Sequence, residues 1–253
     1  MSHIPRHDAI LKIISRLRTV TVQELTERLD VSEVTIRKDL TLLEEMGSII
    51  RTRGGARLAE DRAQLRNILM RREEHREEKR AIAAKAREFV HEDDTIYVDS
   101  GSTCMLIAQT LSDMSLRVVT NSLDAMTVLA DAPGISLFSV GGSYRKEAGS
   151  FIGPMALKIL ANFQIEICFV GATGFSMGGV FSSQNIIESE LKAKALQASK
   201  RRIIVADASK FGRDAFSVFA RASEVDILIT DRWVAGMEGL QEAGIEVIAC
   251  GVQ

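Results

Sequence analysis

Six short apolar runs constrain the fold of this chain more than any other feature of its sequence. They cover residues 95–98, 116–120, 135–140, 167–170, 203–206 and 225–229, and segments of helical periodicity separate them. A run that is apolar on both faces is typical of a strand covered on both sides. We therefore expect a mostly parallel α/β sheet from residue 94 onward, with helices on both of its faces.

Polar residues and glycines follow nearly every one of these runs. Ligands of parallel α/β sheets bind beyond the carboxyl ends of the strands, so these residues form the candidate site. Unpaired N–H groups at a helix N-terminus favour an anion, which makes Ser102 and Thr103 the first choice for holding a phosphate, with Lys210 as countercharge. Gly and Ser are common after any strand, so an inert α/β scaffold is the alternative. The candidates are Asp99, Ser100, Gly101, Ser102, Thr103, Asn121, Ser122, Gly141, Gly142, Arg145, Gly171, Ala172, Asp207 and Lys210.

The N-terminal residues predict three short helices. Residues 21–24, Thr-Val-Gln-Glu, fit a capping box that opens the second helix, whose Leu25 and Leu29 point inward. Residues 30–31 then make a tight connection into a third helix. The first helix carries an apolar stripe at Ala9, Ile10, Ile13, Ile14 and Leu17, with Arg6, Lys12 and Arg16 largely off it.

The third helix has two faces. Ile36, Leu40 and Leu43 recur at the spacing of one apolar face, Ser32 is a good N-cap, and Gly47 follows the last periodic residues. An ordinary solvated helix is the alternative, but three short helices with a tight turn before the last describe a helix-turn-helix, whose last helix enters the major groove. The side chains expected at DNA are Ser32, Thr35, Arg37 and Lys38.

Residues 48–58 predict a β-hairpin wing. They contain β-branched residues, a Gly-Gly pair for a tight turn, and three arginines without an acid among them. Arg51, Arg53 and Arg57 are therefore expected to neutralise DNA phosphates or to reach the minor groove. A solvated basic loop is the alternative.

The composition bounds the class of protein. The chain has 253 residues, of which 46% are hydrophobic and 26% charged, which is typical of a soluble protein of about two domains. No apolar run approaches the roughly 20 residues of a membrane span and no signal-peptide core is present, so we expect a cytoplasmic protein. The formal charge is -2, but residues 1–57 carry ten Lys and Arg against eight Asp and Glu. That mild asymmetry permits DNA contact without requiring it.

The three cysteines, Cys104, Cys168 and Cys250, lie far apart in mostly apolar surroundings. They show no metal-ligand spacing, so buried thiols are expected, and neither a metal nor another cofactor is called for.

Residues 59–90 are rich in charge and lack Gly and Pro, which predicts a helical connector. Its mixed charges at residues 71–80 are usually a solvated face, although a linker that transmits the state of a sensor is the functional alternative. Ile82, Ala83, Ala86, Phe89 and Val90 form an apolar face in its later part. We therefore expect a DNA-binding domain over 1–58, a linker over 59–73 and a second domain over 74–253.

The motifs in both domains resemble those of the DeoR family of bacterial sugar-metabolism repressors. The N-terminal match rests on residues 22–25, 31–32, 35–40 and 51–56. The family often has Arg where Lys38 stands and His where Arg53 stands. Because Lys lacks the bidentate fork of Arg, Lys38 is expected to contact phosphate and not to read a base. The C-terminal match covers about residues 74–247 and rests on 99–103, 120–122, 141–145, 171–174, 188–192 and 207–212.

The resemblance implies a winged helix-turn-helix followed by a Rossmann-like domain similar to ribose-5-phosphate isomerase, with a phosphorylated sugar as effector. It also places Glu188 or Glu190 near the basic glutamate of the isomerase, although Glu-x-Glu-x-x-Lys spacing is also common on solvated helices. Where the isomerase has Asp-Gly-Ala-Asp, this chain has Val170-Gly171-Ala172-Thr173, so both carboxylates are missing.

These features predict a ligand-responsive repressor of a carbohydrate operon and not an enzyme. Its expected partners are operator DNA, a phosphorylated sugar and at least one further copy of the chain, as a homodimer or homotetramer, because one helix reads only a short half-site. The alternatives are a phosphosugar isomerase and a DNA-binding activator without a small ligand.

Overall fold

A computed structural model describes residues 3–17, 19–45, 49–58 and 73–251. The chain divides into two compact units, residues 1–69 and 70–253. The predicted linker lies outside the described residues except for residue 73, as does the predicted helix stop at Gly47. In the part of the chain that the structure describes, no helix is long and apolar enough to cross a membrane.

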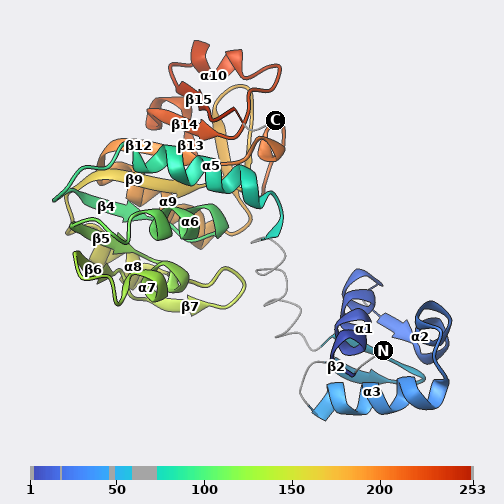
Figure 1. Cartoon of the computed structure of the whole chain (residues 1–253). Coiled ribbons are helices and arrows are strands. Elements are labelled where there is room, and N and C mark those ends of the chain that lie inside the picture. The colour runs from blue at the N-terminus through green and yellow to red at the C-terminus, as the bar shows by residue number, and fades with distance from the viewer. Residues whose placement is uncertain (1–2, 18, 46–48, 59–72, 252–253) are drawn as a thin grey trace. The chain divides into compact units, whose positions relative to one another are not determined.

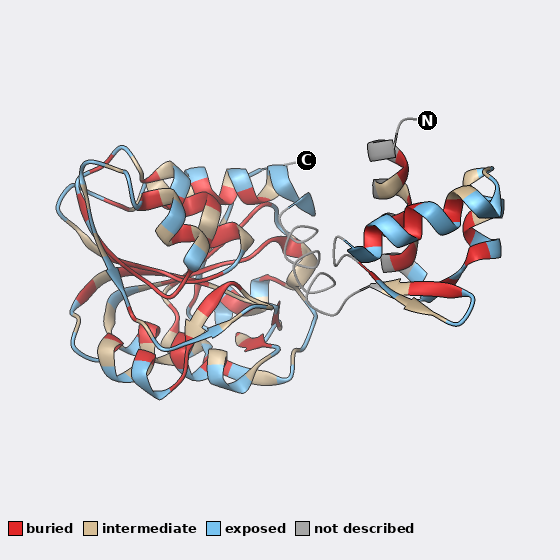
Figure 2. Cartoon of the chain, turned by 90° about the horizontal axis from the view of Figure 1, so that it is seen from below, coloured by how far each residue is buried: buried red, intermediate tan, exposed pale blue. Residues whose placement is uncertain are grey.

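The N-terminal unit is a winged helix-turn-helix, as predicted. Its elements are α1 (His3–Leu17), β1 (Thr19–Thr21), α2 (Val22–Leu29), α3 (Glu33–Glu45), β2 (Ile49–Thr52) and β3 (Gly55–Leu58), and the strands pair antiparallel in the order β1-β3-β2. The capping box at Thr21 and Glu24 is present. The predicted apolar faces supply most of the core: Ile10, Ile14, Leu25, Ile36, Leu40 and Leu43 are buried, whereas Leu17, predicted on the stripe of the first helix, is exposed. Figure 2 colours the buried residues red. The short strand β1 was not predicted.

Two adjacent glycines build the wing for different reasons. Gly54 has φ +88°, a conformation that favours glycine over residues with a side chain. At Gly55 a Cβ atom would lie 1.9 Å from the carbonyl oxygen of Val20, because β3 packs between β1 and β2. The Gly-Gly pair is therefore set by one turn and one close backbone approach.

The prediction that Arg6 lies off the buried face of the first helix is wrong. Arg6 is 8% exposed, and its guanidinium donates to both carboxylate oxygens of Asp39 on α3. His7 lies 3.1 Å from the same carboxylate. A buried charge needs a partner of opposite sign, and the partner came from a helix 33 residues away along the chain. The apolar pattern of one helix could not show it.

The C-terminal unit contains a seven-stranded parallel sheet in the order β15-β14-β12-β9-β4-β5-β6. Six strands match the predicted runs, and the seventh, β15, was not predicted. Their bounds are β4 (Thr95–Val98), β5 (Leu116–Thr120), β6 (Ile135–Ser139), β9 (Ile165–Gly171), β12 (Ser199–Val205), β14 (Ile227–Thr230) and β15 (Glu246–Ala249).

Helices cover both faces of this sheet (Figure 1). On one face lie α5 (Arg76–Arg87), α6 (Ser102–Thr110) and α7 (Leu123–Leu129), and on the other lie α8 (Pro154–Leu160), α9 (Ile186–Gln197) and α10 (Glu238–Glu242). The predicted apolar face of the connector is real, with Ile82, Ala83 and Ala86 buried. The cysteines are free thiols, Cys104 and Cys168 fully buried and Cys250 partly so.

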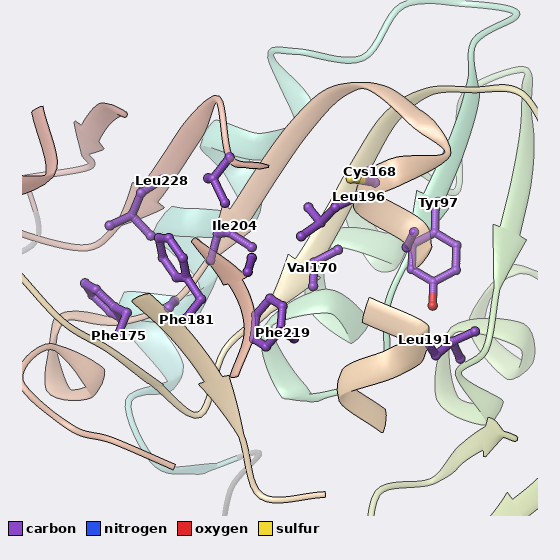
Figure 3. Close-up of a cluster of buried hydrophobic side chains, with 14 of the residues drawn as sticks. Tyr97, Cys168, Val170, Phe175, Phe181, Leu191, Leu196, Ile204, Phe219 and Leu228 are labelled. Carbon is purple, nitrogen blue, oxygen red and sulfur yellow. The ribbon is translucent and has the colours of Figure 1, made fainter. Parts of the chain in front are cut away.

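Two small antiparallel elements were not predicted. A hairpin joins β7 (Ser143–Arg145) to β8 (Ser150–Ile152), and a second sheet has the order β10-β11-β13, with β10 (Gly174–Phe175), β11 (Val180–Ser183) and β13 (Ser217–Arg221). Two single turns of 3-10 helix, η1 (Ala208–Lys210) and η2 (Ala222–Glu224), follow β12 and β13. Phe175, Phe181 and Phe219 of the second sheet pack in the same hydrophobic core as Val170 and Ile204 (Figure 3).

Candidate functional site

The outer face of α3 presents the predicted DNA-contacting side chains. Arg37 and Lys38 are exposed, whereas Ile36 and Leu40 face the core. Arg37 forms an exposed ion pair with Glu33 at 2.9 Å. Such a pair contributes little stability and can open to meet a phosphate.

Ser32 and Thr35 have a structural role at the start of α3. The Thr35 N–H donates to the Ser32 hydroxyl at 3.3 Å, and the two side-chain oxygens lie 2.9 Å apart. Ser32 is thus the predicted N-cap, and both hydroxyls stay near the helix surface. Caps of this kind fix the angle at which a helix starts.

The wing arginines differ in position. Arg53 is exposed at the hairpin turn between β2 and β3, whereas Arg51 and Arg57 are half-buried. Arg51 donates to the backbone carbonyl of Arg37 at 3.4 Å, which ties β2 to α3. Arg53 is therefore the wing cation that is least engaged by its own fold.

In the C-terminal unit, neighbouring strands bring two predicted residues together. Val98 pairs with Thr120 in the β4–β5 register, so Asp99 and Asn121 follow side by side at the carboxyl edge. Both are fully buried. Gly101, with φ +115°, then caps α6, whose first residues are Ser102 and Thr103. The predicted phosphate-holding turn therefore lies directly beside this pair.

The central feature of the edge is a buried ion pair that was not predicted. Lys192 on α9 is 3% exposed and donates to Asp99 Oδ2 and, at 3.0 Å, to the carbonyl of Gly171. Glu188, one helical turn earlier, lies 3.5 Å from the Lys192 ammonium and accepts from Arg145 at 2.8 Å. We call Asp99, Arg145, Glu188 and Lys192 the Asp99–Lys192 network.

The electrostatics of the network keep Lys192 charged. Burial lowers the pKa of a lysine, but the carboxylates of Asp99 and Glu188 outweigh it, and the pKa of Lys192 is raised. Gly171 completes the arrangement, because its N–H donates to Asp99 Oδ2 at 3.2 Å. Glu188 and Lys192 are therefore not part of a solvated helix face, and only the exposed Glu190 fits that interpretation.

Several buried polar atoms beside this network have no hydrogen-bond partner among the described residues. They are Asp99 Oδ1, both side-chain polar atoms of Asn121, and the hydroxyl of Ser150. Ser150 lies on β8, which is held to the end of β5 by the bond from Phe151 N–H to the carbonyl of Asn121 at 2.8 Å. Native interiors pair nearly all such groups, so an unpaired cluster suits a polar ligand.

A second polar region follows β12, two strands away from β4 in the sheet. Asp207 is 2% exposed and accepts from the backbone N–H and hydroxyl of Ser209. Lys210 ends the same short turn and is half-buried. In the described chain its ammonium has no hydrogen-bond or ion-pair partner. The two predicted residues of this loop thus lie together.

The remaining predicted positions lie in the loops that follow β4, β5, β6 and β9. Gly141 and Gly142, both at positive φ, connect β6 to the β7–β8 hairpin that carries Arg145. Ser122 caps α7, and Ala172 packs against the core. Lys192 and Ser150 were missed as site residues. The only signal for Lys192 was its place in the 188–192 motif, and Ser150 had none.

Comparison with known proteins places these features in a family. The model of the DeoR C terminal sensor domain matches residues 74–232, and the model of the DeoR-like helix-turn-helix domain matches residues 6–62. This chain belongs to the DeoR family. The predicted resemblance is therefore confirmed, and this DeoR-family protein is a DNA-binding transcriptional regulator and not an enzyme.

Three relatives cover between 88% and 98% of the chain. The HTH-type transcriptional repressor GlcR of Bacillus subtilis is 33% identical over 88% of this chain and 86% of its own length. The lactose phosphotransferase system repressor of Staphylococcus epidermidis is 30% identical over 98% and 100%. A putative aga operon transcriptional repressor of Escherichia coli is 30% identical over 95% and 92%.

Two solved structures illustrate distant matches. Ribose 5-phosphate isomerase A from Methanocaldococcus jannaschii has a TM-score of 0.40 at 15% identity, over 54% of this chain and 55% of the isomerase, so about half of that enzyme is spanned. The eIF2B delta subunit from Chaetomium thermophilum has a TM-score of 0.46 at 14% identity, over 78% and 63%. Likenesses this distant do not bear on function.

Proposed function

We propose that this DeoR-family protein represses a carbohydrate-metabolism operon and that a phosphorylated sugar modulates its binding to the operator. The names of its relatives, which include a lactose phosphotransferase system repressor and a putative aga operon repressor, support the operon class. The proposal also keeps the division into a DNA-binding domain over 1–58, a linker over 59–73 and an effector domain over 74–253, and a cytoplasmic location.

The DNA contacts are assigned to the outer face of α3 and to the wing. The assignment is supported by the exposure of Arg37, Lys38 and Arg53, three cations on one small domain. Ser32, Thr35, Arg51 and Arg57 complete the set at its margins. Arg37 is the base-reading candidate, because its guanidinium can form two parallel hydrogen bonds, and Lys38 is assigned to phosphate.

The observation that carries the effector assignment is the group of buried polar atoms at Asp99, Asn121 and Ser150 that have no hydrogen-bond partner among the described residues. A sugar supplies hydroxyl groups that both donate and accept, which is what a carboxylate oxygen, an amide and a hydroxyl require. The phosphate is assigned to the start of α6, at Ser102 and Thr103, with Lys210 as countercharge. Glu188 and Arg145 are then expected to border the sugar on the side of the site nearest α9.

The isomerase alternative requires carboxylates at positions 170 and 173, and this chain has Val170 and Thr173 there. Val170 is fully buried in the core and Thr173 is exposed. Neither can act as the carboxylate base that moves a proton between adjacent carbons. Turnover of ribose 5-phosphate by the purified protein above background would revive this alternative.

The test uses the full chain with ribose 5-phosphate, fructose 6-phosphate and glucose 6-phosphate, each beside its unphosphorylated sugar. At least one of the three sugar phosphates should raise the unfolding temperature, since a ligand at 100 times its Kd stabilises the native state by about 2.7 kcal/mol. The same compound should change affinity for a duplex selected from random DNA. A protein that binds DNA but responds to none of them would support the activator alternative.

The variant Arg37→Ala separates the two functions. It should weaken DNA binding by roughly 5- to 150-fold while leaving the thermal shift by the sugar phosphate intact. Lys200→Ala is the matched control, because it removes an exposed cation from the sensor domain. Unchanged DNA affinity in Arg37→Ala would refute the assignment of α3 as the recognition helix.

A further inference from the structure

The first helix of the sensor domain carries a buried lysine that the site above does not use. Lys79 on α5 is 4% exposed. Its ammonium donates to the backbone carbonyl of Glu74, in the turn that precedes the helix. A lysine is almost never buried this fully without a specific electrostatic reason.

The orientation of α5 brings this lysine to the ligand-binding edge of the sheet. Two residues beyond the C-terminal end of the helix, the Phe89 ring lies 4.5 Å from the Arg201 guanidinium, and Arg201 is near the start of β12. The helix therefore runs against the direction of the strands. Its first turn lies at their carboxyl ends, where the Asp207–Lys210 turn follows β12.

Charges in the Asp207–Lys210 turn influence the pKa of a side chain on α5. Burial lowers the pKa of Lys79, the carboxylate of Asp207 opposes this, and the ammonium of Lys210 adds to it. A backbone hydrogen bond and the ring of His75, at 3.2 Å, lower the pKa of Glu78, and the carboxylate of Asp207 weakly opposes this. Glu78 and Lys79 on α5 thus lie within electrostatic reach of the Asp207–Lys210 turn, at the predicted phosphate end of the site.

The same helix packs on the other phosphate-holding element. Figure 1 shows α5 and α6 side by side on one face of the sheet, and Ile82, Ala83 and Ala86 share a core with Leu106 and Ile107. His75, which precedes α5, has φ +53°, a conformation that is strained for a residue with a side chain. The junction with the linker is therefore held by local contacts that a nearby charge can alter.

We propose that Lys79 couples effector binding to DNA binding. An effector phosphate at Ser102, Thr103 and Lys210 attracts the Lys79 ammonium away from the Glu74 carbonyl and rearranges the first turn of α5, the first described element after the linker. The inference rests on the proposed function, because it needs an anionic effector at this edge. A ligand can change DNA affinity only if it favours one of two arrangements of the protein, and here the two arrangements are those of the first turn of α5.

The test uses the full chain with the three sugar phosphates named above and the duplex it selects. In the wild type, an effector is expected to change DNA affinity by about 5- to 150-fold. In Lys79→Met, the duplex should still bind and the sugar phosphate should still raise the unfolding temperature, but the change in DNA affinity should fall below about twofold. Lys79→Arg, which keeps the charge, should restore most of it.

The matched control is Arg80→Met on the same helix. Arg80 is exposed and pairs only with Glu77 among the described residues, so its loss should leave the response to effector intact. A full response in Lys79→Met would overturn this inference and leave the proposed function standing. A wild type that responds to no sugar phosphate would overturn both.

Hydrogen exchange of the wild type gives a second test that does not depend on a variant folding. The Lys79 N–H donates to the His75 carbonyl at 3.0 Å, so its exchange reports on the first turn of α5. The sugar phosphate should change exchange there by at least severalfold. Unchanged exchange in a protein that releases or gains DNA on effector binding would also overturn the inference.

Discussion

Two buried aspartates differ in how completely their oxygens are paired. Asp39 on α3 has both oxygens engaged by Arg6 and His7. Asp99 is paired with Lys192 through one oxygen, while its other oxygen has no partner among the described residues. A fully paired buried carboxylate holds elements in place, whereas a partly paired one is costly unless a ligand completes it.

Asp39 should therefore govern the stability of the DNA-binding domain. Burial raises its pKa, but hydrogen bonds from Arg6 and His7 outweigh burial, and the pKa is lowered. Its folded-state pKa lies below the unfolded value of about 3.9, so its stabilisation is present above about pH 4 and is lost as the pH falls through the folded value.

We expect Asp39→Asn to lower the unfolding temperature of this domain by roughly 5 to 10 °C at pH 7, because it leaves Arg6 buried beside a neutral group. The difference from the wild type should shrink below pH 4. Scanning calorimetry of the full chain across pH measures both effects. Glu33→Gln, which breaks only an exposed pair, is the control. Equal stability of Asp39→Asn and wild type at pH 7 would contradict the structural role.

At the scale of elements, local pattern was enough for six of the seven strands of the large sheet and for the three helices of the N-terminal domain. The predicted bounds of β4 and β5 match the structure residue for residue, since a short, mostly apolar run between polar residues is a local signal. The strands β10, β11 and β13 have no such signal. Phe181 pairs with Ala220, 39 positions later, and that pairing decides whether either is a strand.

The site shows the same division between local and distant information. Loop residues such as Ser102, Asn121 and Asp207 were predictable, because their position after a strand is enough to place them at one edge. The Asp99–Lys192 pair joins residues 93 positions apart, and Arg145 meets Glu188 over 43. The spacing of Glu188 and Lys192 within α9 is typical of a solvated face, and only the fold shows that this face is turned toward the sheet.

The wing offers a test of element-level packing, because Gly54 and Gly55 differ in what an added Cβ would meet. At Gly54 there is nothing within 4 Å, so Ala there adds mainly the strain of positive φ, of the order of 1 kcal/mol. Ala at Gly55 collides with backbone of β1 and must displace the wing. We expect Gly55→Ala to lower both the unfolding temperature and DNA affinity clearly more than Gly54→Ala. Equal effects would show that the β1–β3 contact is not needed.

At the scale of the whole molecule, the charge distribution limits how one copy can hold DNA. The chain is net negative, and the excess of basic residues in the first 57 positions is only two. Electrostatic attraction alone is therefore weak, and a single α3 reads only a short half-site. Affinity for an operator then has to come from two α3 helices acting together, which is why we propose at least a dimer.

A dimer makes a prediction about the spacing of half-sites. Inserting 5 base pairs between the two halves of the selected duplex turns one of them to the opposite side of the helix, since a turn takes about 10 to 10.5 base pairs. Binding should weaken by at least tenfold, and an insertion of 10 base pairs should recover more affinity than one of 5. Sedimentation of the complex should count at least two chains per duplex. A duplex with one half-site that binds as tightly as the full operator would mean that single copies act alone, and Arg37 and Arg53 of one domain would then have to supply the affinity that we assign to two.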